Sequence, residues 1–300
     1  MARSSSGRDQ CPIANMRTTP LPSLFVSHGS PMIALEPGAA GAFMQRLGSR
    51  WLGHFGRPAA ILTISAHTSA RLPALLAGRR HQAVYDFGNF DPRLNEMRYD
   101  APGAPALAER VAGLLEAADI AVRQIDESGL DHGAWTALRY LFPSADIPIL
   151  PLAFVASDPP QSQFELGEAL APLRSENVLI LGSGSMTHNL QRVFTGGLRA
   201  NPNQPEIAQS QVFRKWFVDH SSARDWPALF DYRQRAPHAV DMHPSDEHLL
   251  PWYVAAGAGG RQSAPVRLHD SVTYGALGMD VYGFGASAAE LPDVLEAPVR

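Results

Sequence analysis

Short apolar runs alternate with longer amphipathic segments along most of this chain, and this alternation constrains its fold more than any other feature. Runs rich in branched or large apolar residues predict strands at about 22–27, 60–66, 120–124, 147–154 and 177–182. Segments with helical periodicity lie at about 38–53, 104–119, 133–142, 162–174 and 203–220. Such alternation is typical of an α/β fold, with a central mixed, mostly parallel sheet flanked by helices.

A polar N-terminal stretch and two irregular segments interrupt this pattern. We expect residues 1–20 to be a disordered leader, and both Met1 and Met16 are candidate start sites. The stretch 81–103 reads as a long aromatic loop, of a length that is uncommon in compact domains unless the loop is functional or mobile. Residues 221–247 also look irregular, whereas 267–284 predicts closing strands with Gly-rich turns. Since no linker or repeat divides the chain, we predict a single domain over 21–290.

The composition excludes several classes of partner. The formal net charge is −4 without any long block of like charges, which gives no electrostatic reason to expect nucleic acid or an anionic membrane. No run of about 18 apolar residues occurs, so we expect no membrane span. Cys11 is the only cysteine, which excludes an intramolecular disulfide and favours a cytoplasmic location. A homo-oligomer is compatible with all of these properties.

Three histidines follow predicted strands. His28 and His67 come directly after apolar runs, and "VLILGSGSMTHNL" carries a third run through a Gly/Ser turn to His188. Ligands of open α/β sheets bind beyond the carboxyl ends of the strands, so these side chains can converge without being close in sequence. Each of them, taken alone, is more typical of a turn residue that hydrogen-bonds to backbone than of a ligand.

A further cluster, "HPSDEHLLP", adds His243, Glu247 and His248. Neutral imidazole is the commonest protein metal ligand near neutral pH and suits zinc, iron, copper or nickel. Taken together with the strand-following histidines, this cluster favours a metal site, although independent turn residues fit the same positions.

The segment "GLDHGAW" admits two interpretations. Asp131 is a favoured residue for capping the predicted helix at 133–142. Alternatively, His132 lies in the crevice as a hydrogen-bonding or proton-transfer partner of a substrate. Nucleophilic catalysis has little support, because Ser30 and Ser183 lack a GxSxG elbow. A phosphate-binding loop at "GSGSMTH" also has little support, because the segment lacks the lysine of such a loop.

Seven segments together resemble a known family. Their order and spacing are similar to those of the class III extradiol ring-cleavage dioxygenases of the LigB-like superfamily, in the branch called 4,5-DOPA dioxygenase extradiol. The resemblance covers about residues 21–284 and implies that the predicted domain is catalytic. The segments are "SLFVSHGSPM", "TISAH", "YDFGNF", "YDAPGAPALAERV", "GLDHGAW", "VLILGSGSMTHNL" and "HPSDEHLLPWYVAAGA".

The resemblance implies a mononuclear site with Fe(II) for catalysis, and zinc in the same place in purified bacterial members. The family's ligand histidines fall on His28, His67 and His248. His188 matches the histidine that acts as acid or base at the metal, or as a fourth ligand when zinc is bound. His132 matches a histidine that we expect in the substrate shell, as a second proton donor.

The sequence departs from the family pattern at the aromatic loop. Many relatives have His at the position of Tyr85 and "GFP" where this chain has "NFD" at 89–91, which puts ring specificity in doubt. His243 ranks below His248 as a ligand. Glu247 is the residue to consider if the site is a triad of two histidines and one carboxylate.

The implied activity is insertion of O2 into a catechol, such as DOPA or a related aromatic diol, to give a ring-opened semialdehyde. Two alternatives stay open at this point: a zinc-dependent hydrolase built from the same histidines, and a non-catalytic binding protein on the same scaffold. The sequence names neither the catechol nor the position of cleavage.

Overall fold

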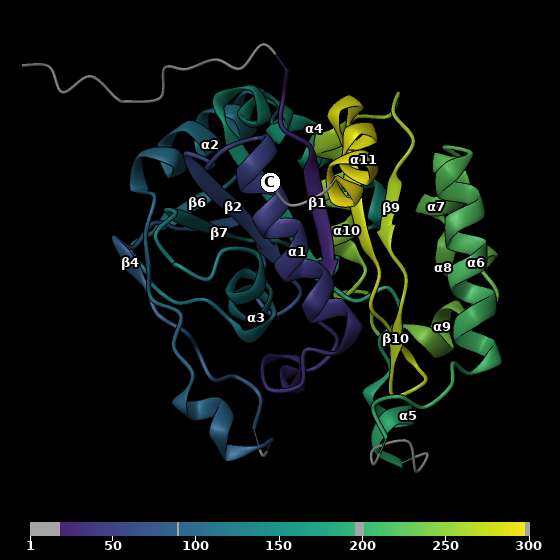
Figure 1. Cartoon of the computed structure of the whole chain (residues 1–300). Helices are drawn as coiled ribbons and strands as arrows, with labels where there is room; N and C mark the ends of the chain where they lie inside the picture. Colours follow the sequence, from purple (N-terminus) through teal and green to yellow (C-terminus); the bar gives the residue numbers. More distant parts are fainter. Residues whose placement is uncertain (1–18, 89, 196–200, 298–300) are drawn as a thin grey trace, which may run out of the picture.

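The chain folds around one eight-stranded mixed sheet (Figure 1). The computed structural model describes residues 19–88, 90–195 and 201–297. The strands are β1 (Ser23–Ser27), β2 (Ala60–Ser65), β3 (Ala74–Leu76), β4 (Arg80–His81), β5 (Ala101–Pro102), β6 (Arg123–Ile125), β7 (Ile149–Ala153), β8 (Val178–Gly184), β9 (Val266–His269), β10 (Val272–Thr273), β11 (Leu277–Gly278) and β12 (Val281–Phe284). Their order across the main sheet is β6-β3-β7-β2-β8-β1-β12-β9, and β4-β5 and β10-β11 form separate pairs.

Helices cover both faces of this sheet (Figure 1). The α-helices are α1 (Gly38–His54), α2 (Pro105–Ala117), α3 (His132–Leu141), α4 (Pro160–Leu170), α5 (Leu190–Thr195), α6 (Ala208–Ser222), α7 (Trp226–Phe230), α8 (Tyr232–Arg235), α9 (Ala239–Met242), α10 (Leu250–Gly259) and α11 (Leu291–Glu296). The short 3-10 helices of the described residues are η1 (Pro31–Ala34), η2 (Pro92–Glu96), η3 (Ala171–Glu176) and η5 (Ala286–Glu290). In Figure 1, α6 to α9 form a column at one side of the molecule, beyond β9.

Parallel pairing dominates the middle of the sheet. β2 pairs in parallel with both β7 and β8, and β8 pairs in parallel with β1. Antiparallel pairs join β3 to β7 on one side, and β1 to β12 and β12 to β9 on the other. Every residue of β1, β2, β7 and β8 is buried, because helices cover both faces. The predicted α/β fold with a mixed, mostly parallel sheet is therefore confirmed.

Strand β8 shows how the two faces build two hydrophobic cores. Val178 and Ile180 belong to the core formed with α2, α4 and α10, whereas Leu179 and Leu181 belong to the core formed with α1 and α3. This alternation is the two-residue period of a strand. Since β1, β2 and β8 run parallel, the residues that follow them meet at one edge of the sheet.

The structure differs from the sequence prediction in its shorter elements. The strand predicted over 120–124 is β6, which begins only at Arg123. Strands β3, β4 and β5 have two or three residues each, too few to show a period. The helix predicted over 203–220 begins at Ala208, and the one predicted over 162–174 ends at Leu170 and continues as η3.

The segment 221–247 is not irregular, which corrects the prediction. It contains α7, α8 and α9, and the carboxylate of Asp225 caps α7 by accepting a hydrogen bond from the N–H of Ala228. The closing strands predicted over 267–284 are found as β9 to β12. Residues 1–18 of the predicted leader lie outside the described residues. Among the described helices, none has both the length and the apolar character that crossing a membrane requires.

Candidate metal centre

His28 sits at the carboxyl end of β1, with its side chain fully buried. Its backbone N–H continues the parallel ladder by donating to the carbonyl of Gly184, at 2.8 Å. Gly29 follows in the left-handed region with φ of +63°, and a Cβ there would lie 2.5 Å from the sulfur of Met279. Glycine therefore suits this sharp turn, which fixes the exit direction of the chain and with it the ring of His28.

His67 is held through the residues on either side of it. The hydroxyls of Ser65 and Thr68 each donate to the carboxylate of Asp131, at 2.5 Å. Asp131 also accepts from the backbone N–H of Ala134 and so caps α3. The capping interpretation of Asp131 is therefore confirmed, and the same carboxylate ties the turn that carries His67 to the start of α3.

His248 approaches from the chain before α10. Its carbonyl accepts a hydrogen bond from the N–H of Ser185, at 2.9 Å. A Cβ at Gly184 would lie 2.0 Å from that carbonyl oxygen, so a side chain at this position would displace His248. The backbone of His248 thus packs directly against the backbone at the end of β8.

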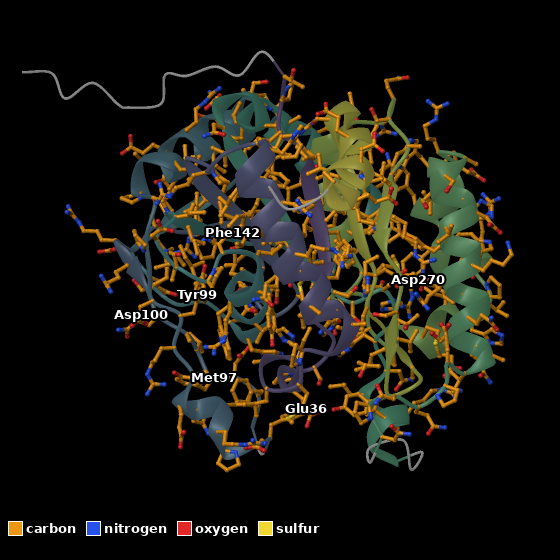
Figure 2. All side chains as sticks on the ribbon, in the orientation of Figure 1. Glu36, Met97, Tyr99, Asp100, Phe142 and Asp270 are labelled. Atoms are coloured by element: carbon orange, nitrogen blue, oxygen red, sulfur yellow. The ribbon has the colours of Figure 1, made fainter. Side chains whose placement is uncertain are left out.

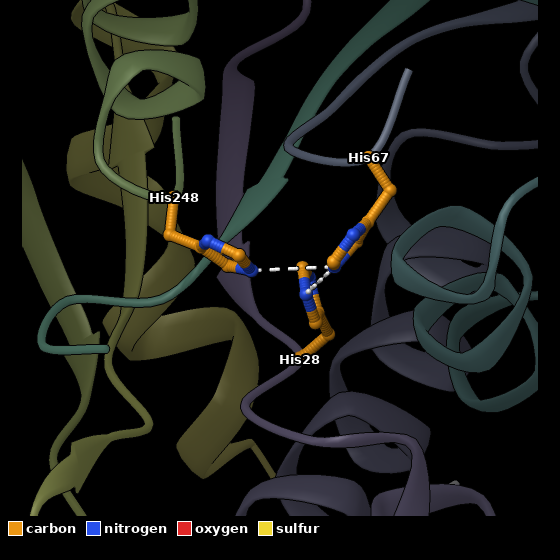
Figure 3. A group of neighbouring side chains, drawn as sticks. All are labelled: His28, His67 and His248. Atoms are coloured by element: carbon orange, nitrogen blue, oxygen red, sulfur yellow. Dashed lines mark hydrogen bonds between the residues drawn. The ribbon is translucent and has the colours of Figure 1, made fainter. Parts of the chain in front are cut away.

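These three histidines converge at the carboxyl edge of the sheet (Figure 3). Nε2 of His67 lies 3.2 Å from Nε2 of His28 and 3.2 Å from Nε2 of His248. One ligand atom of each lies within 4.8 Å of the others. Nitrogens bound to one zinc ion at about 2.0–2.1 Å are about 3 Å apart, so the spacing fits coordination of a single cation.

The other ring nitrogens of His28 and His248 are already engaged. Nδ1 of His28 lies 3.0 Å from the hydroxyl of Ser183, which itself donates to the carbonyl of Gly133 at 2.6 Å. The hydroxyl therefore accepts from Nδ1–H. Nδ1 of His248 likewise donates to the carboxylate of Glu247, at 3.1 Å. Both bonds leave a lone pair on Nε2, which is the tautomer that a metal ligand needs.

The electrostatics of the cluster keep its imidazoles neutral. Burial, together with the neighbouring His67 and His248, lowers the pKa of His28 well below its usual value. Burial and His188 do the same for the pKa of His248, and burial and His132 lower the pKa of His67. All three are therefore unprotonated near neutral pH and present lone pairs rather than charge.

His188 lies beside this group and not within it. Its ring stacks on that of His248, with centroids 3.4 Å apart. The three-histidine group of the described residues does not include it. Burial and the neighbouring His243 lower the pKa of His188 to about 3.

His132 lies beside two histidines of the group. Its ring centroid is 3.9 Å from that of His67 and 5.6 Å from that of His28. Nδ1 of His132 lies 2.9 Å from the carboxylate of Asp86, a residue of the aromatic loop. The segment "YDFGNF" contains Asp86, for which the sequence predicts no role. Its position in a loop of functional length was the only signal.

The remaining candidates have structural partners. His243 is buried, and its Nε2 donates to the carbonyl of Met186 at 2.9 Å, so its ring does not join the cluster. Glu247 contacts Nδ1 of His248 and also accepts from Ser245, which places it behind a ligand. A triad with Glu247 in place of a histidine therefore does not match the geometry.

Within the aromatic loop, Tyr85 contacts residues near the loop's other end. The phenol of Tyr85 donates to the carbonyl of Met97 at 2.6 Å, and the guanidinium of Arg98 lies 5.6 Å from the ring centroid. Asn89 lies outside the described residues, and Asp91 caps η2. The residues that depart from the family pattern thus include two that shape the loop itself.

A cavity of about 260 Å³ extends from His28 along η1 and the first turn of α1. Its lining is largely apolar, and the ionisable side chains of the described lining are His28, Glu36 and Tyr274. Figure 2 shows Glu36 near the lower edge of the molecule, below α1. The cavity offers room beside His28 for a small organic group.

Comparison with known proteins gives this site a family. The model of the family described as "Catalytic LigB subunit of aromatic ring-opening dioxygenase" matches residues 22–285. The chain belongs to the LigB family. This membership confirms the family resemblance seen in the sequence. The protein is therefore an enzyme, an aromatic ring-opening dioxygenase, and neither the hydrolase nor the binding-protein alternative is favoured.

Relatives of this LigB protein cover nearly its whole length. The 4,5-DOPA dioxygenase extradiol of Beta vulgaris is 33% identical over 87% of this chain and 96% of its own. The 4,5-DOPA dioxygenase extradiol of Escherichia coli K12 is 34% identical over 88% of this chain and 94% of its own. The crystal structure of the uncharacterized protein JW3007 from Escherichia coli K12 is 29% identical, with a TM-score of 0.71 over 88% of this chain and 100% of that one.

Proposed function

We propose that this LigB enzyme inserts O2 into the ring of a catechol at an Fe(II) ion held by His28, His67 and His248. The observation that carries the proposal is the convergence of three neutral imidazole nitrogens, two of them with their tautomer fixed by Ser183 and Glu247. Imidazole suits iron as well as zinc, and three ligands on one side leave positions for a diol and O2. The carbon–carbon bond beside the diol would break, and both oxygen atoms would enter a ring-opened semialdehyde acid.

When bound, Fe(II) would acidify a coordinated catechol hydroxyl and supply the redox chemistry that O2 requires. The chain's own part is to orient the ring and move protons. His188 is neutral, so it is free to accept the proton of the hydroxyl.

We assign His132 as the second proton-transfer group. Its ring lies close to those of His28 and His67, and Asp86 holds its Nδ1. His188 thus lies against His248, and His132 lies beside His67 and His28. We place His188 in proton transfer rather than coordination, because its ring stacks on that of His248.

Reconstitution under argon tests this function. The metal-free protein is loaded with Fe(II), a panel of catechols is added with air, and O2 uptake is followed together with the yellow colour of ring-opened products. Zinc fits the same nitrogens, and we propose that it occupies them in purified protein. A zinc-loaded sample is thus the matched control: because zinc is redox-inert, it should consume no O2. Lack of O2 uptake with every catechol after full Fe(II) loading would refute the proposal.

A further inference from the structure

Asp86 makes two contacts with one residue. The same carboxylate oxygen, Oδ1, accepts the backbone N–H of His132 at 3.1 Å and lies 2.9 Å from Nδ1 of its ring. An ionised carboxylate only accepts hydrogen bonds, so Nδ1 must carry the proton. Although burial opposes it, the hydrogen bond from His132 lowers the pKa of Asp86, which keeps this carboxylate ionised. The ring therefore keeps Nε2 as the nitrogen available to a substrate.

The loop segment that carries Asp86 is fastened to α3 and its surroundings. The N–H of Val84 donates to the carbonyl of Leu130 at 2.8 Å, and the indole N–H of Trp135 donates to the carbonyl of Val84 at 3.1 Å. Phe87 is buried and packs edge-on against the ring of His132, with centroids 5.6 Å apart. The chain is therefore anchored both before Asp86, at Val84, and after it, at Phe87.

The far end of the loop is also anchored. The phenol of Tyr99 donates to the carbonyl of Phe142, which follows the last residue of α3, at 2.9 Å. Figure 2 shows Tyr99 and Phe142 near each other at the side of the molecule. The loop thus contacts both the first turn and the C-terminal end of α3. These contacts with the helix hold Asp86 close to His132.

We propose that Asp86 is the positioning residue of His132: it fixes the ring plane and the tautomer in which Nε2 faces the bound ring. This inference rests on the proposed function of His132 as a proton-transfer group. Ligand atoms of His67, Asp86 and His132 also lie within 4.8 Å of one another, an arrangement that a second cation would fit. The hydrogen bond from His132 to Asp86 favours the positioning role over a second cation site. The number of metal ions bound per chain distinguishes these two possibilities.

Turnover of the Fe(II)-loaded enzyme gives the first test. We expect Asp86→Ala to lower kcat about 10- to 100-fold, the loss typical of removing an outer partner of a site histidine, with KM changed little. Asp86→Glu, which keeps a carboxylate, should recover part of the loss. The matched control is Asp225→Ala, because Asp225 also holds a histidine ring, that of His220 at 2.8 Å, and also accepts a backbone N–H at the start of a helix. An unchanged kcat in Asp86→Ala would overturn the proposal.

A double-mutant comparison tests whether Asp86 acts through His132. Residues that act as a unit are strongly non-additive, so Asp86→Ala combined with His132→Ala should be no slower than His132→Ala alone. If the fold-loss in kcat of the double variant equals the product of the two single losses, the positioning role is overturned. If His132→Ala itself keeps full activity, the proposed function of His132 fails instead, and the two failures are thereby distinguished.

Ring nitrogen spectroscopy provides a readout besides activity. In zinc-loaded, ¹⁵N-histidine-labelled protein, the two nitrogens of His132 are identified by their loss in His132→Ala. We expect a protonated Nδ1 in the wild type and a mixture of tautomers in Asp86→Ala. An unchanged spectrum would contradict the proposal. So would two zinc ions per wild-type chain with one lost in Asp86→Ala, since that result would identify a second cation site.

Discussion

The ring of His188 lies flat against that of His248, with centroids 3.4 Å apart and planes inclined by 8°. His188 therefore contacts a proposed metal ligand, but it is not a member of the group formed by His28, His67 and His248. Removing the ring therefore removes both a proposed proton carrier and the ring that packs against His248. Any variant at this position has to separate the two effects.

Two substitutions at His188 separate them. His188→Phe keeps a flat ring against His248 but cannot carry a proton, whereas His188→Ala removes both. We expect both variants to lose about 10²- to 10⁴-fold in turnover, the usual contribution of general acid–base catalysis, while His188→Phe keeps wild-type metal content. Steady-state rates and elemental analysis give these quantities. Loss of metal from His188→Phe would show that His188 is a ligand.

The three proposed ligands should be required for metal binding itself. We expect His28→Ala and His248→Ala to purify with far less than one metal ion per chain, because two imidazoles hold a cation much less tightly than three. His54→Ala is the control, since His54 lies on the surface of α1 and pairs with Glu290. Elemental analysis and circular dichroism measure metal and folding together. Full metal content in a folded His28→Ala protein would disprove the ligand assignment.

Ser183 should tune the metal through His28. Its hydroxyl is the acceptor of Nδ1–H of His28, so Ser183→Ala frees the ring to rotate and to change tautomer. We expect zinc affinity to fall about 10- to 100-fold, as found for other outer partners of metal-bound histidines. Ser185→Ala serves as control: this serine is equally buried but donates to the carbonyl of Thr187. Competition with a chromogenic chelator measures both affinities, and equal values would remove Ser183 from the site.

The sequence predicts the central sheet well for a physical reason. β2 and β8 are buried on both faces, so they appear as continuous apolar runs, and their carboxyl ends lead to the site. His28 and His67 could be predicted because each follows such a strand directly. Elements such as β4 and α8 have two and four residues and leave no periodic signal.

The partners of the histidines could not be predicted in the same way. Asp86 meets His132 across 46 residues, and Ser183 meets His28 across 155 residues. The first contact depends on how the aromatic loop folds, and the second depends on how β1 pairs with β8. No local pattern encodes either. The sequence considers Ser183 only as a nucleophile and gives that role little support, because no GxSxG elbow surrounds it. In the structure, Ser183 is the last residue but one of β8, and its hydroxyl accepts a hydrogen bond from a ring N–H.

Buried His243 should make stability depend on pH in a defined window. Burial lowers its pKa to about 4, although the bond to the carbonyl of Met186 and the charge of Asp246 oppose this. An unfolded histidine titrates near a pKa of about 6.5. Above that pH both states are neutral at this residue. Between about 6.5 and about 4 the unfolded state binds a proton that the folded state excludes, so stability falls as the pH falls.

His243→Gln tests this contribution, because the glutamine amide N–H can donate to the carbonyl of Met186 but the amide does not titrate. In metal-free protein, we expect the wild-type free energy of unfolding to fall more steeply between pH 6.5 and pH 4 than that of His243→Gln, by up to about 1.4 kcal/mol per pH unit. The other buried histidines are present in both proteins. His243 also lowers the pKa of His188 and of His248, so its removal shifts the difference in the same direction. Urea denaturation at pH 7, 6 and 5 measures it. Parallel curves for the two proteins would mean that His243 binds its proton equally in both states, and the assignment of a buried neutral ring would be wrong.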